Sequence, residues 1–387
     1  MRLRRSVPAI FLLLLLVFLA MGLGTTRYRR GASFVVIAAG MEGMARRVAE
    51  WHTTPVSTLG ETWVSWRGGV LRARAYQPYR ATGRGILLVP GVHAAGIDEP
   101  RLIGFAQHLA AFGHPVLTVE LPDLMHYEIT TRSTDMIEDA AAWAMRRPEY
   151  RGADGRIGML GISFGGGLSI VAAGRASIRD RVAFVMALGG HADLPRTLKY
   201  LCTGVQADGS TRPPHDYGLA IVLLGAAHLV VPAPQVDPLR DAIRSFLEAS
   251  RLDMVDKPKA AAEFARAKRL AETLAEPSKT YMGYVNDRDV AHLGPVLLPH
   301  VAALGGDPSL SPERSPLPSA PLFLLHGTDD NVVPAIESTL LGRHAAAAGV
   351  RAHVLLTPLI THAEVDRGST VAAMWRLVDF WGALLAA

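Results

Sequence analysis

The feature that most constrains the fold is a series of short apolar runs that alternate with helix-like segments. Four of these runs come early in the chain, "RGILLVPG", "HPVLTVELPD", "RIGMLGIS" and "VAFVMALGG", and two come late, "APLFLLHG" and "VRAHVLLT". A strand without polar residues is buried on both faces, which happens when helices cover both sides of a parallel sheet. The alternation therefore predicts an α/β fold with a mostly parallel central sheet covered by helices on both faces.

The sheet pattern is interrupted once, in the second half of the chain. Residues 195–317 contain a long apolar stretch, "YGLAIVLLGAAHLVVPAP", then charged runs with helical spacing, and finally the Pro- and Ser-rich "GDPSLSPERSPLPSAP". Such a segment is typical of a helical insertion that returns to the sheet through a linker. We therefore predict a core of residues 31–194 and 318–387 and a mainly helical cap of residues 195–317.

The first 30 residues differ from the rest of the chain in charge and hydropathy. They hold six arginines and no acidic residue, and residues 7–23 carry no charge. We expect an N-terminal membrane anchor, with the body of the chain exported. Two alternatives stay open, a signal peptide whose cleavage leaves a secreted or periplasmic protein, and a buried helix. The apolar spacing of residues 34–51, which come next in the chain, predicts one amphipathic helix.

The same segment explains the charge balance. The net charge of the whole chain is +5, and the six N-terminal arginines account for this surplus. The body of the protein is therefore close to neutral and offers no electrostatic footprint for a nucleic-acid partner.

The third apolar run ends in a serine between glycines. Gly161, Ser163 and Gly165 fit the pattern G-x-S-x-G, and a helix-like segment follows at once. A sharp turn from strand to helix leaves no room for side chains beside the serine, and the free N–H groups of the helix favour a nearby negative charge. The pattern also occurs in ordinary Gly/Ser-rich turns, so a nucleophilic role depends on a base and an acid elsewhere in the chain.

Candidates for both partners follow the last two apolar runs. Asp329 and Asp330 come directly after "LFLLHG", and His362 comes just after "VRAHVLLT", in "LLTPLITHAEVD". The carboxyl ends of parallel strands meet at one edge of the sheet, where α/β folds place their sites. Serine, acid and histidine also occur in the order expected for a triad built around a strand–turn–helix serine.

In "GISFGG", in "HGTDDNVVP" and in a histidine after the next strand, the chain resembles the α/β-hydrolase superfamily, and within it serine esterases and lipases with an inserted helical cap. The resemblance covers residues 60–194 and 318–387. It implies Ser163 as the nucleophile, His362 as the base and Asp330 as the acid, with the neighbouring aspartate as the alternative acid.

The resemblance also implies two backbone N–H donors for the oxyanion of a reaction intermediate. One is Phe164, which follows the nucleophile, and the other is Val92 in "PGVHAAG", with His93 as the alternative. His93 and His191 follow apolar runs and are candidates for contact with substrate, although a structural role is the more common one. No metal or other cofactor is implied, and no zinc, phosphate-loop or dinucleotide motif occurs.

Two further residues have ordinary structural interpretations. We expect His326 to hold its loop, and Cys202 to act as a small buried apolar residue. Taken together, the sequence predicts a serine hydrolase that cleaves carboxylic esters, with a small-molecule ester or a lipid as substrate. A serine peptidase, an acyltransferase and a non-catalytic scaffold on the same fold are the alternatives.

Overall fold

The computed structural model describes residues 25–253, 255–360 and 371–387. In this part of the chain eight strands form one sheet, in the order β1-β2-β4-β3-β5-β6-β7-β8. β2 pairs antiparallel with β1 and with β4, and the other neighbouring pairs are parallel. The predicted fold class is confirmed. The strands are β1 (Val56–Trp66), β2 (Gly69–Pro78), β3 (Ile86–Val89), β4 (Val116–Val119), β5 (Ile157–Ile162), β6 (Val182–Leu188), β7 (Leu322–Gly327) and β8 (Ala352–Thr357).

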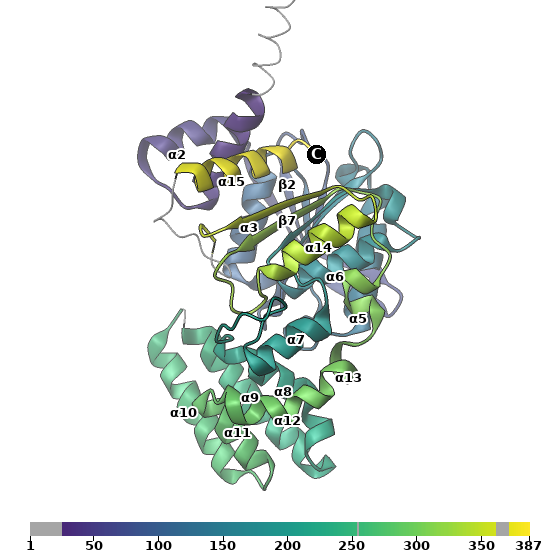
Figure 1. Ribbon diagram of the computed structural model, residues 1–387. Helices are drawn as coiled ribbons and strands as arrows, with labels where there is room; N and C mark the ends of the chain where they lie inside the picture. The colour runs from purple at the N-terminus through teal and green to yellow at the C-terminus, as the bar shows by residue number, and fades with distance from the viewer. Residues whose placement is uncertain (1–24, 254, 361–370) are drawn as a thin grey trace, which may run out of the picture.

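Helices cover both faces of the sheet (Figure 1). One face carries α3, α15 and a helix of residues 25–38, and the other carries α5, α6 and α14. The helices of the core are α2 (Gly43–Ala49), α3 (Pro100–Ala111), α4 (Pro122–Met125), α5 (Thr131–Met145), α6 (Phe164–Gly174), α14 (Ile336–Ala347) and α15 (Val371–Leu384). Short 3-10 turns are η1 (Glu50–His52), η2 (Gly96–Asp98), η3 (Pro148–Tyr150), η4 (Arg179–Arg181), η5 (Leu298–His300), η6 (Pro308–Leu310) and η7 (Pro312–Arg314).

Successive residues of a central strand belong to opposite layers of the core. In β3, Leu87 and Val89 pack in the cluster that contains α5 and α6, whereas Ile86 and Leu88 pack in the cluster that contains α3 and α15. Because both faces of these strands are buried, each position needs an apolar side chain. This is the physical origin of the unbroken apolar runs in the sequence.

The N-terminal prediction falls mostly outside the described residues, which begin at residue 25. Among the described residues, no helix combines the length and the hydropathy needed to cross a bilayer. The single helix predicted over 34–51 is wrong. The chain instead forms a helix over 25–38 and then α2, because Gly40 and Gly43 adopt positive φ angles of 61° and 73° that break the helix between them.

The chain between β6 and β7 forms a body of helices below the sheet in Figure 1. These helices are α7 (Leu194–Thr203), α8 (Asp216–Val230), α9 (Ala233–Asp253), α10 (Lys257–Thr273), α11 (Ser278–Asp287), α12 (Val290–Leu297) and α13 (Val301–Gly305). α8 carries the long apolar stretch, and its Ala220, Leu223 and Leu224 are buried against neighbouring helices. Its interpretation as a buried helix is confirmed, while the role of residues 195–317 as a cap stays a prediction.

An ion-pair network joins both ends of this helical segment to the core. Glu337, at the start of α14, is 1% exposed, and its carboxylate accepts hydrogen bonds from Arg196 of α7 and from two backbone N–H groups just before α7. Arg196 also pairs with Glu313, at 2.8 Å, and Asp193 pairs with Arg314. The start of α7 and the η7 turn are thus held at one buried carboxylate.

We expect Glu337→Ala to lower the free energy of unfolding by about 3 kcal/mol, because it removes one partner of a buried ion pair and leaves two N–H groups without their acceptor. Glu272→Ala, at an exposed position of α10, is the matched control and is expected to stay within about 0.5 kcal/mol of the parent chain. Urea unfolding followed by circular dichroism measures both variants. If Glu337→Ala and Glu272→Ala unfolded with equal free energies, the stabilising role of the Glu337 network would be contradicted.

Candidate active site

Ser163 occupies a strained turn between β5 and α6. Its backbone has φ 53° and ψ −133°, and α6 begins at the next residue, Phe164. The Ser163 N–H donates to the Leu188 carbonyl at the end of β6, at 2.7 Å, and the side chain is nearly buried. Positive φ is uncommon for a residue other than glycine, and it is found where the surrounding structure holds a functional side chain in place.

The two glycines of the pattern are required by the close packing of this turn. A Cβ atom on Gly161 would lie 2.3 Å from the Gly165 carbonyl oxygen, and a Cβ on Gly165 would lie 2.1 Å from the Pro90 carbonyl oxygen. Neither oxygen belongs to a side chain that could move aside. The steric explanation given for these glycines from the sequence is therefore confirmed.

The loop after β3 packs directly against the serine. A Cβ on Gly91 would lie 3.2 Å from both the Ser163 Cβ and the Ile162 carbonyl oxygen. Val92 is the next residue of this loop, and Phe164 is the first residue of α6, whose N–H has no partner within its own helix. Of the two predicted oxyanion donors, Phe164 therefore follows Ser163 directly, and Val92 follows the residue that packs against Ser163.

Asp330 is a buried carboxylate held by its own loop after β7. Its Oδ1 accepts hydrogen bonds from the backbone N–H groups of Val332, at 2.9 Å, and Val333, at 3.0 Å, and the residue is 3% exposed. The side chain of Asp329, in contrast, is 71% exposed and faces Arg212, with Oδ1 3.3 Å from Nη2. Of the two candidate acids, Asp330 is the one whose carboxylate is fixed in the interior.

Ser163 and Asp330 lie at the same edge of the sheet. β6 separates the two strands that carry them, and Gly189 at the end of β6 donates its N–H to the Leu325 carbonyl of β7, at 2.8 Å. A Cβ on Gly189 would lie 3.3 Å from the Asp330 Oδ2. Two strand spacings correspond to about 10 Å, a gap that one imidazole ring between the serine and the carboxylate would bridge.

The sheet order, the serine turn after β5 and the buried acid after β7 together identify the architecture. The chain has the α/β-hydrolase fold. The predicted base, His362, lies outside the described residues. The strand before it, β8, ends at Thr357, whose carbonyl accepts a hydrogen bond from the Thr328 N–H, at 3.0 Å. The chain thus leaves β8 beside the loop that carries Asp330.

Comparisons with known proteins returned solved structures of low sequence identity. No family model matches the chain, and no curated protein matches it. A Pyrobaculum calidifontis esterase covers 94% of this chain and 94% of its own, at 15% identity and a TM-score of 0.46. A thermostable carboxylesterase cloned from a metagenomic library covers 93% and 94%, at 18% identity and a TM-score of 0.44.

A third solved structure, a Pyrococcus horikoshii acylaminoacyl peptidase, covers 87% of this chain at 14% identity and a TM-score of 0.47. This chain spans only 42% of that peptidase, so it is similar to one part of a longer protein. The activities in these names belong to those proteins. The α/β-hydrolase fold of this chain is identified by its own strand order and by the turn at Ser163.

The structure places His191 in the core, which favours the structural role over the alternative of contact with substrate. The side chain is fully buried, its Nε2 donates to the Leu310 carbonyl at 2.8 Å, and its ring packs 5.5 Å from the ring of Phe164. Burial lowers the pKa of His191, so the ring is held neutral. His191 therefore supports α6 from the interior of the hydrolase fold.

Two other histidines have separate roles near the site. His93 lies in the loop after β3, where its Nδ1 accepts from the Ala95 N–H at 3.2 Å and burial lowers its pKa. His326 is fully buried, its Nε2 donates to the Val333 carbonyl at 2.8 Å, and its Nδ1 accepts from Ser338 at 2.7 Å. The prediction that His326 holds its loop is confirmed. Contact of His93 with substrate stays a prediction.

Two tyrosines near the site were not found from the sequence. Tyr127 has φ 63°, its hydroxyl lies beside the backbone of Ala94, and burial raises its pKa to about 12, with Glu248 of α9 adding to this. Tyr217, at the start of α8, has its pKa raised by burial and by the charge of Asp330. Neither tyrosine belongs to a local motif, and both reach the site through contacts between segments distant in sequence.

Neither Cys202 nor a metal-ligand cluster forms a second catalytic centre in the described residues. Cys202 is buried, which raises its pKa to about 12, as expected for an inert apolar position. Within the described residues, no group of three His, Cys, Asp or Glu side chains is arranged to hold a metal ion.

The packing of the serine turn predicts opposite effects for two helical glycines. We expect Gly165→Ala to lower the free energy of unfolding by more than about 3 kcal/mol, because its Cβ meets a backbone oxygen that cannot move aside. Gly104→Ala in α3 is the control, since a Cβ there has no neighbour within 4 Å and alanine is the better helix former by about 1 kcal/mol. Urea unfolding compares them, and a tolerated Gly165→Ala would contradict the described turn.

Proposed function

We propose that this protein is a serine hydrolase that cleaves carboxylic esters through an acyl-enzyme intermediate. The observation that carries the proposal is the strained backbone of Ser163 at a strand–helix turn, on the same sheet edge as the buried carboxylate of Asp330. A serine hydroxyl is a weak nucleophile at neutral pH and needs a base that an acid orients. The loop after β8 leads to His362, which we propose as that base.

In the proposed reaction, the Ser163 Oγ attacks the carbonyl carbon of the ester while His362 Nε2 takes the hydroxyl proton. The carbonyl oxygen becomes an oxyanion, for which the N–H groups of Phe164 and Val92 are the proposed donors. A donor of this kind is worth about 3–4 kcal/mol in the transition state. His362 then returns the proton to the leaving alcohol, and water attacks the acyl-enzyme with His362 again as the base.

The environment of Asp330 supports its role as the orienting acid. Oδ1 accepts hydrogen bonds from two backbone N–H groups, and Oδ2, which lies 3.3 Å from His326 Nε2, is the oxygen nearer to Gly189 and β6. Oδ2 is therefore the atom proposed to accept a hydrogen bond from His362 Nδ1. A carboxylate in this position fixes the imidazole and stabilises its positive charge during proton transfer.

The surroundings of the site favour an apolar acyl group. Val92, Tyr127 and Tyr217 are partly buried side chains that pack on the core. Tyr127 lies beside the backbone of Ala94 in the loop after β3, and Tyr217 lies near Asp330. Apolar walls with few polar groups are typical of sites for small apolar ligands. We therefore propose a hydrophobic ester or lipid as substrate, acted on by a membrane-anchored protein whose catalytic domain is exported.

A fluorophosphonate probe tests the nucleophile, because it reacts covalently with an activated serine. We expect the full-length chain to be labelled and Ser163→Ala to lose all labelling. Ser169→Ala is the matched control, since Ser169 lies in the same helix with its hydroxyl bonded to the Gly165 carbonyl. An unlabelled parent chain, or labelling that survives in Ser163→Ala, would refute the proposed function.

The choice between the two aspartates is tested by their amides. Asp330→Asn is expected to lower kcat for a p-nitrophenyl ester by about 10⁴-fold, the effect of the same change in a serine-protease triad. Asp329→Asn is expected to leave kcat unchanged, because that carboxylate is largely exposed. Steady-state kinetics of the two variants decide the assignment, which fails if the larger loss occurs in Asp329→Asn.

A screen of p-nitrophenyl esters from acetate to laurate, with short peptide anilides beside them, tests the bond and the acyl group. We expect kcat/KM to rise with the length of the acyl chain and the anilides to be poor substrates. Faster cleavage of anilides would instead support a peptidase, and indifference to chain length would contradict the apolar acyl site.

A further inference from the structure

The short helix α2 presents an apolar stripe to solvent. Met44, Val48 and Trp51 lie along one side of α2 and η1 with exposed fractions of 72%, 43% and 80%. Their spacing of four and then three residues places them on one face of a helix. Ala49 is the buried residue of α2 and lies on the opposite side. The stripe therefore faces away from the body of the protein.

Exposure to water does not stabilise a short helix such as α2 with an apolar stripe on its outer side. α2 has seven residues, and isolated helices of this length are marginal in water. An amphipathic helix normally turns its apolar face toward the core, whereas α2 buries only an alanine and exposes both of its large apolar side chains, Met44 and Val48. A contiguous exposed apolar surface marks a site of interaction with another apolar phase or molecule.

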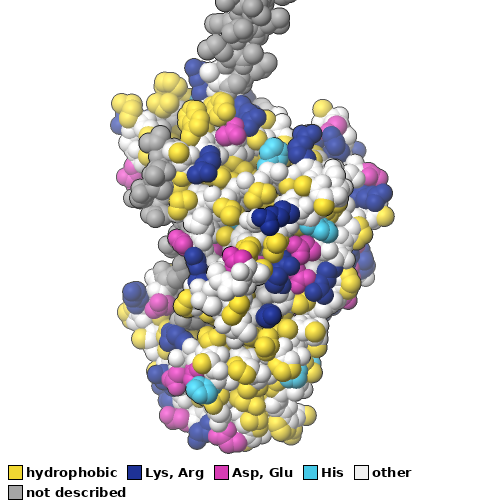
Figure 2. Space-filling view, in the orientation of Figure 1, with side chains coloured by type: hydrophobic (Ala, Val, Ile, Leu, Met, Phe, Trp, Pro, Cys, Tyr) yellow, Lys and Arg dark blue, Asp and Glu magenta, His cyan; other side chains and the backbone are white. Residues whose placement is uncertain are grey.

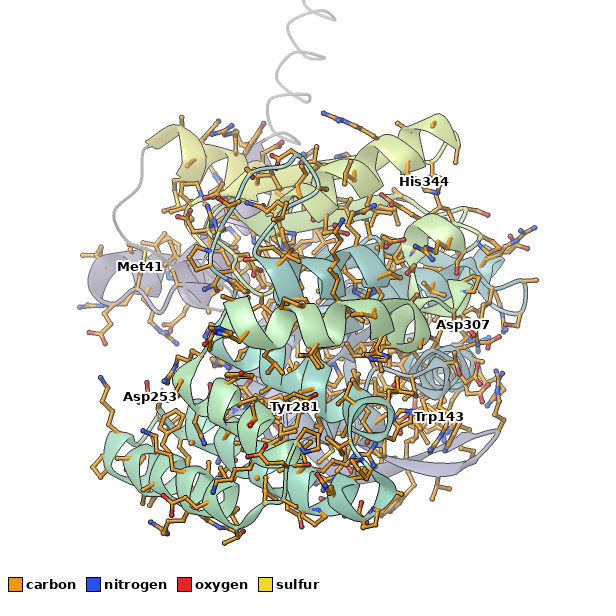
Figure 3. The ribbon with its side chains drawn as sticks, turned by 60° about the horizontal axis from the view of Figure 1, so that its bottom comes forward. Met41, Trp143, Asp253, Tyr281, Asp307 and His344 are labelled. Carbon is orange, nitrogen blue, oxygen red and sulfur yellow. The ribbon has the colours of Figure 1, made fainter. Side chains whose placement is uncertain are left out.

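A second group of exposed aromatic side chains lies at the same end of the molecule. Trp375, at the start of α15, is 60% exposed, and the ring of Tyr28 stacks on it at 5.3 Å with planes 7° apart. α2 and α15 share one packed cluster through Ala49 and the buried residues of α15. Figure 2 shows hydrophobic and basic side chains gathered at this end, and Figure 3 places Met41 on the outer side of the N-terminal helices.

The occupant that fits this surface is a phospholipid bilayer. Tryptophan and tyrosine are favoured at the boundary between headgroups and acyl chains, because their rings are apolar and carry one polar group. Arg29 and Arg47, the sequence neighbours of Tyr28 and Val48, are exposed and suit anionic headgroups. The 24 residues before the described chain include the uncharged run 7–23, and the chain enters the described structure at this same end.

We propose that Met44, Val48 and Trp51, together with Trp375, form an interfacial surface that docks on a phospholipid bilayer and holds the body of the protein against it. α15 follows β8, so its first turn lies toward the carboxyl edge of the sheet, the edge that carries Ser163. Docking would therefore present this edge of the hydrolase fold near the membrane surface. The proposal does not depend on the catalytic assignment.

A fluorescent probe on α2 tests the docking in the full-length protein. Val48→Cys is labelled with an environment-sensitive NBD group, and Cys202 does not compete because it is buried. The protein is reconstituted with vesicles of phosphatidylcholine and phosphatidylglycerol, with or without nitroxide-labelled phosphatidylcholine. Val70→Cys is the matched control. Val70 is an exposed valine, at 62% against 43% for Val48, and it lies near Arg67, which pairs with α5 on the opposite face of the sheet.

We expect the probe at position 48 to shift its emission to shorter wavelength and to lose more than half of its intensity to the nitroxide lipid, while the probe at position 70 is unaffected. Adding Met44→Glu and Trp51→Glu should abolish the quenching, and adding Met44→Leu and Trp51→Phe should preserve it. Circular dichroism checks that each variant is folded.

Three outcomes would overturn the proposal. One is the absence of nitroxide quenching at position 48, and another is quenching that persists with both glutamates in place. The third is a wavelength shift without quenching, accompanied by dimers crosslinked through the introduced thiol, which would assign the stripe to a second copy of the chain. None of these measurements uses catalysis, so their outcome does not test the proposed function.

Discussion

The site depends on how closely the loop after β3 approaches the first turn of α6. The Pro90 carbonyl oxygen occupies the space that a side chain at position 165 would need, and the Gly165 carbonyl does the same to position 161. This packing leaves the chain one way to pass from β5 into α6, through a positive φ at Ser163. The strain of that conformation is maintained because the neighbouring strands and α6 are buried on every side.

The relative positions of the site residues are set by the sheet, since hydrogen bonds join each strand end to the next. Ser163 donates to the end of β6, Gly189 donates to β7, and Thr328 donates to the end of β8. The segments that follow β5, β7 and β8 are thereby placed in a row along one edge. A hydrolase fold can vary its loops and its helical insertion widely while this row keeps its spacing.

Two regions outside the sheet are attached to the core in different ways. The helices between β6 and β7 are held to the core through the buried carboxylate of Glu337, and from them α8 brings Tyr217 toward Asp330. On the other side, α2 carries its apolar stripe outward, at the end of the molecule where the described chain begins. The insertion is thus a packed extension of the core, whereas α2 is a nearly free element on its surface.

The strands, the helical character of the insertion and the turn at Ser163 could be predicted from the sequence. Burial on both faces leaves no polar residue in a central strand, and the steric demand of a sharp turn appears locally as glycines at fixed spacing. The one helix predicted over 34–51 was wrong, because its apolar spacing continues through two glycines whose positive φ angles break the helix. In residues 34–51 the apolar spacing is that of an amphipathic helix, but the backbone does not form one continuous helix.

Which carboxylate is buried depends on how its loop folds, and which histidine faces the core depends on segments far apart in the chain. Asp329 and Asp330 are neighbours in sequence, but only the backbone of the folded loop places one inside with two N–H donors and leaves the other exposed. His191 is buried in the core, where the carbonyl of Leu310, 119 residues away, accepts its hydrogen bond. Sequence alone determined the elements and the chemistry of the serine turn, since these arise from local sterics and burial. Tertiary structure alone decided which groups become hydrogen-bond partners of the buried side chains, because these groups meet only when the chain folds.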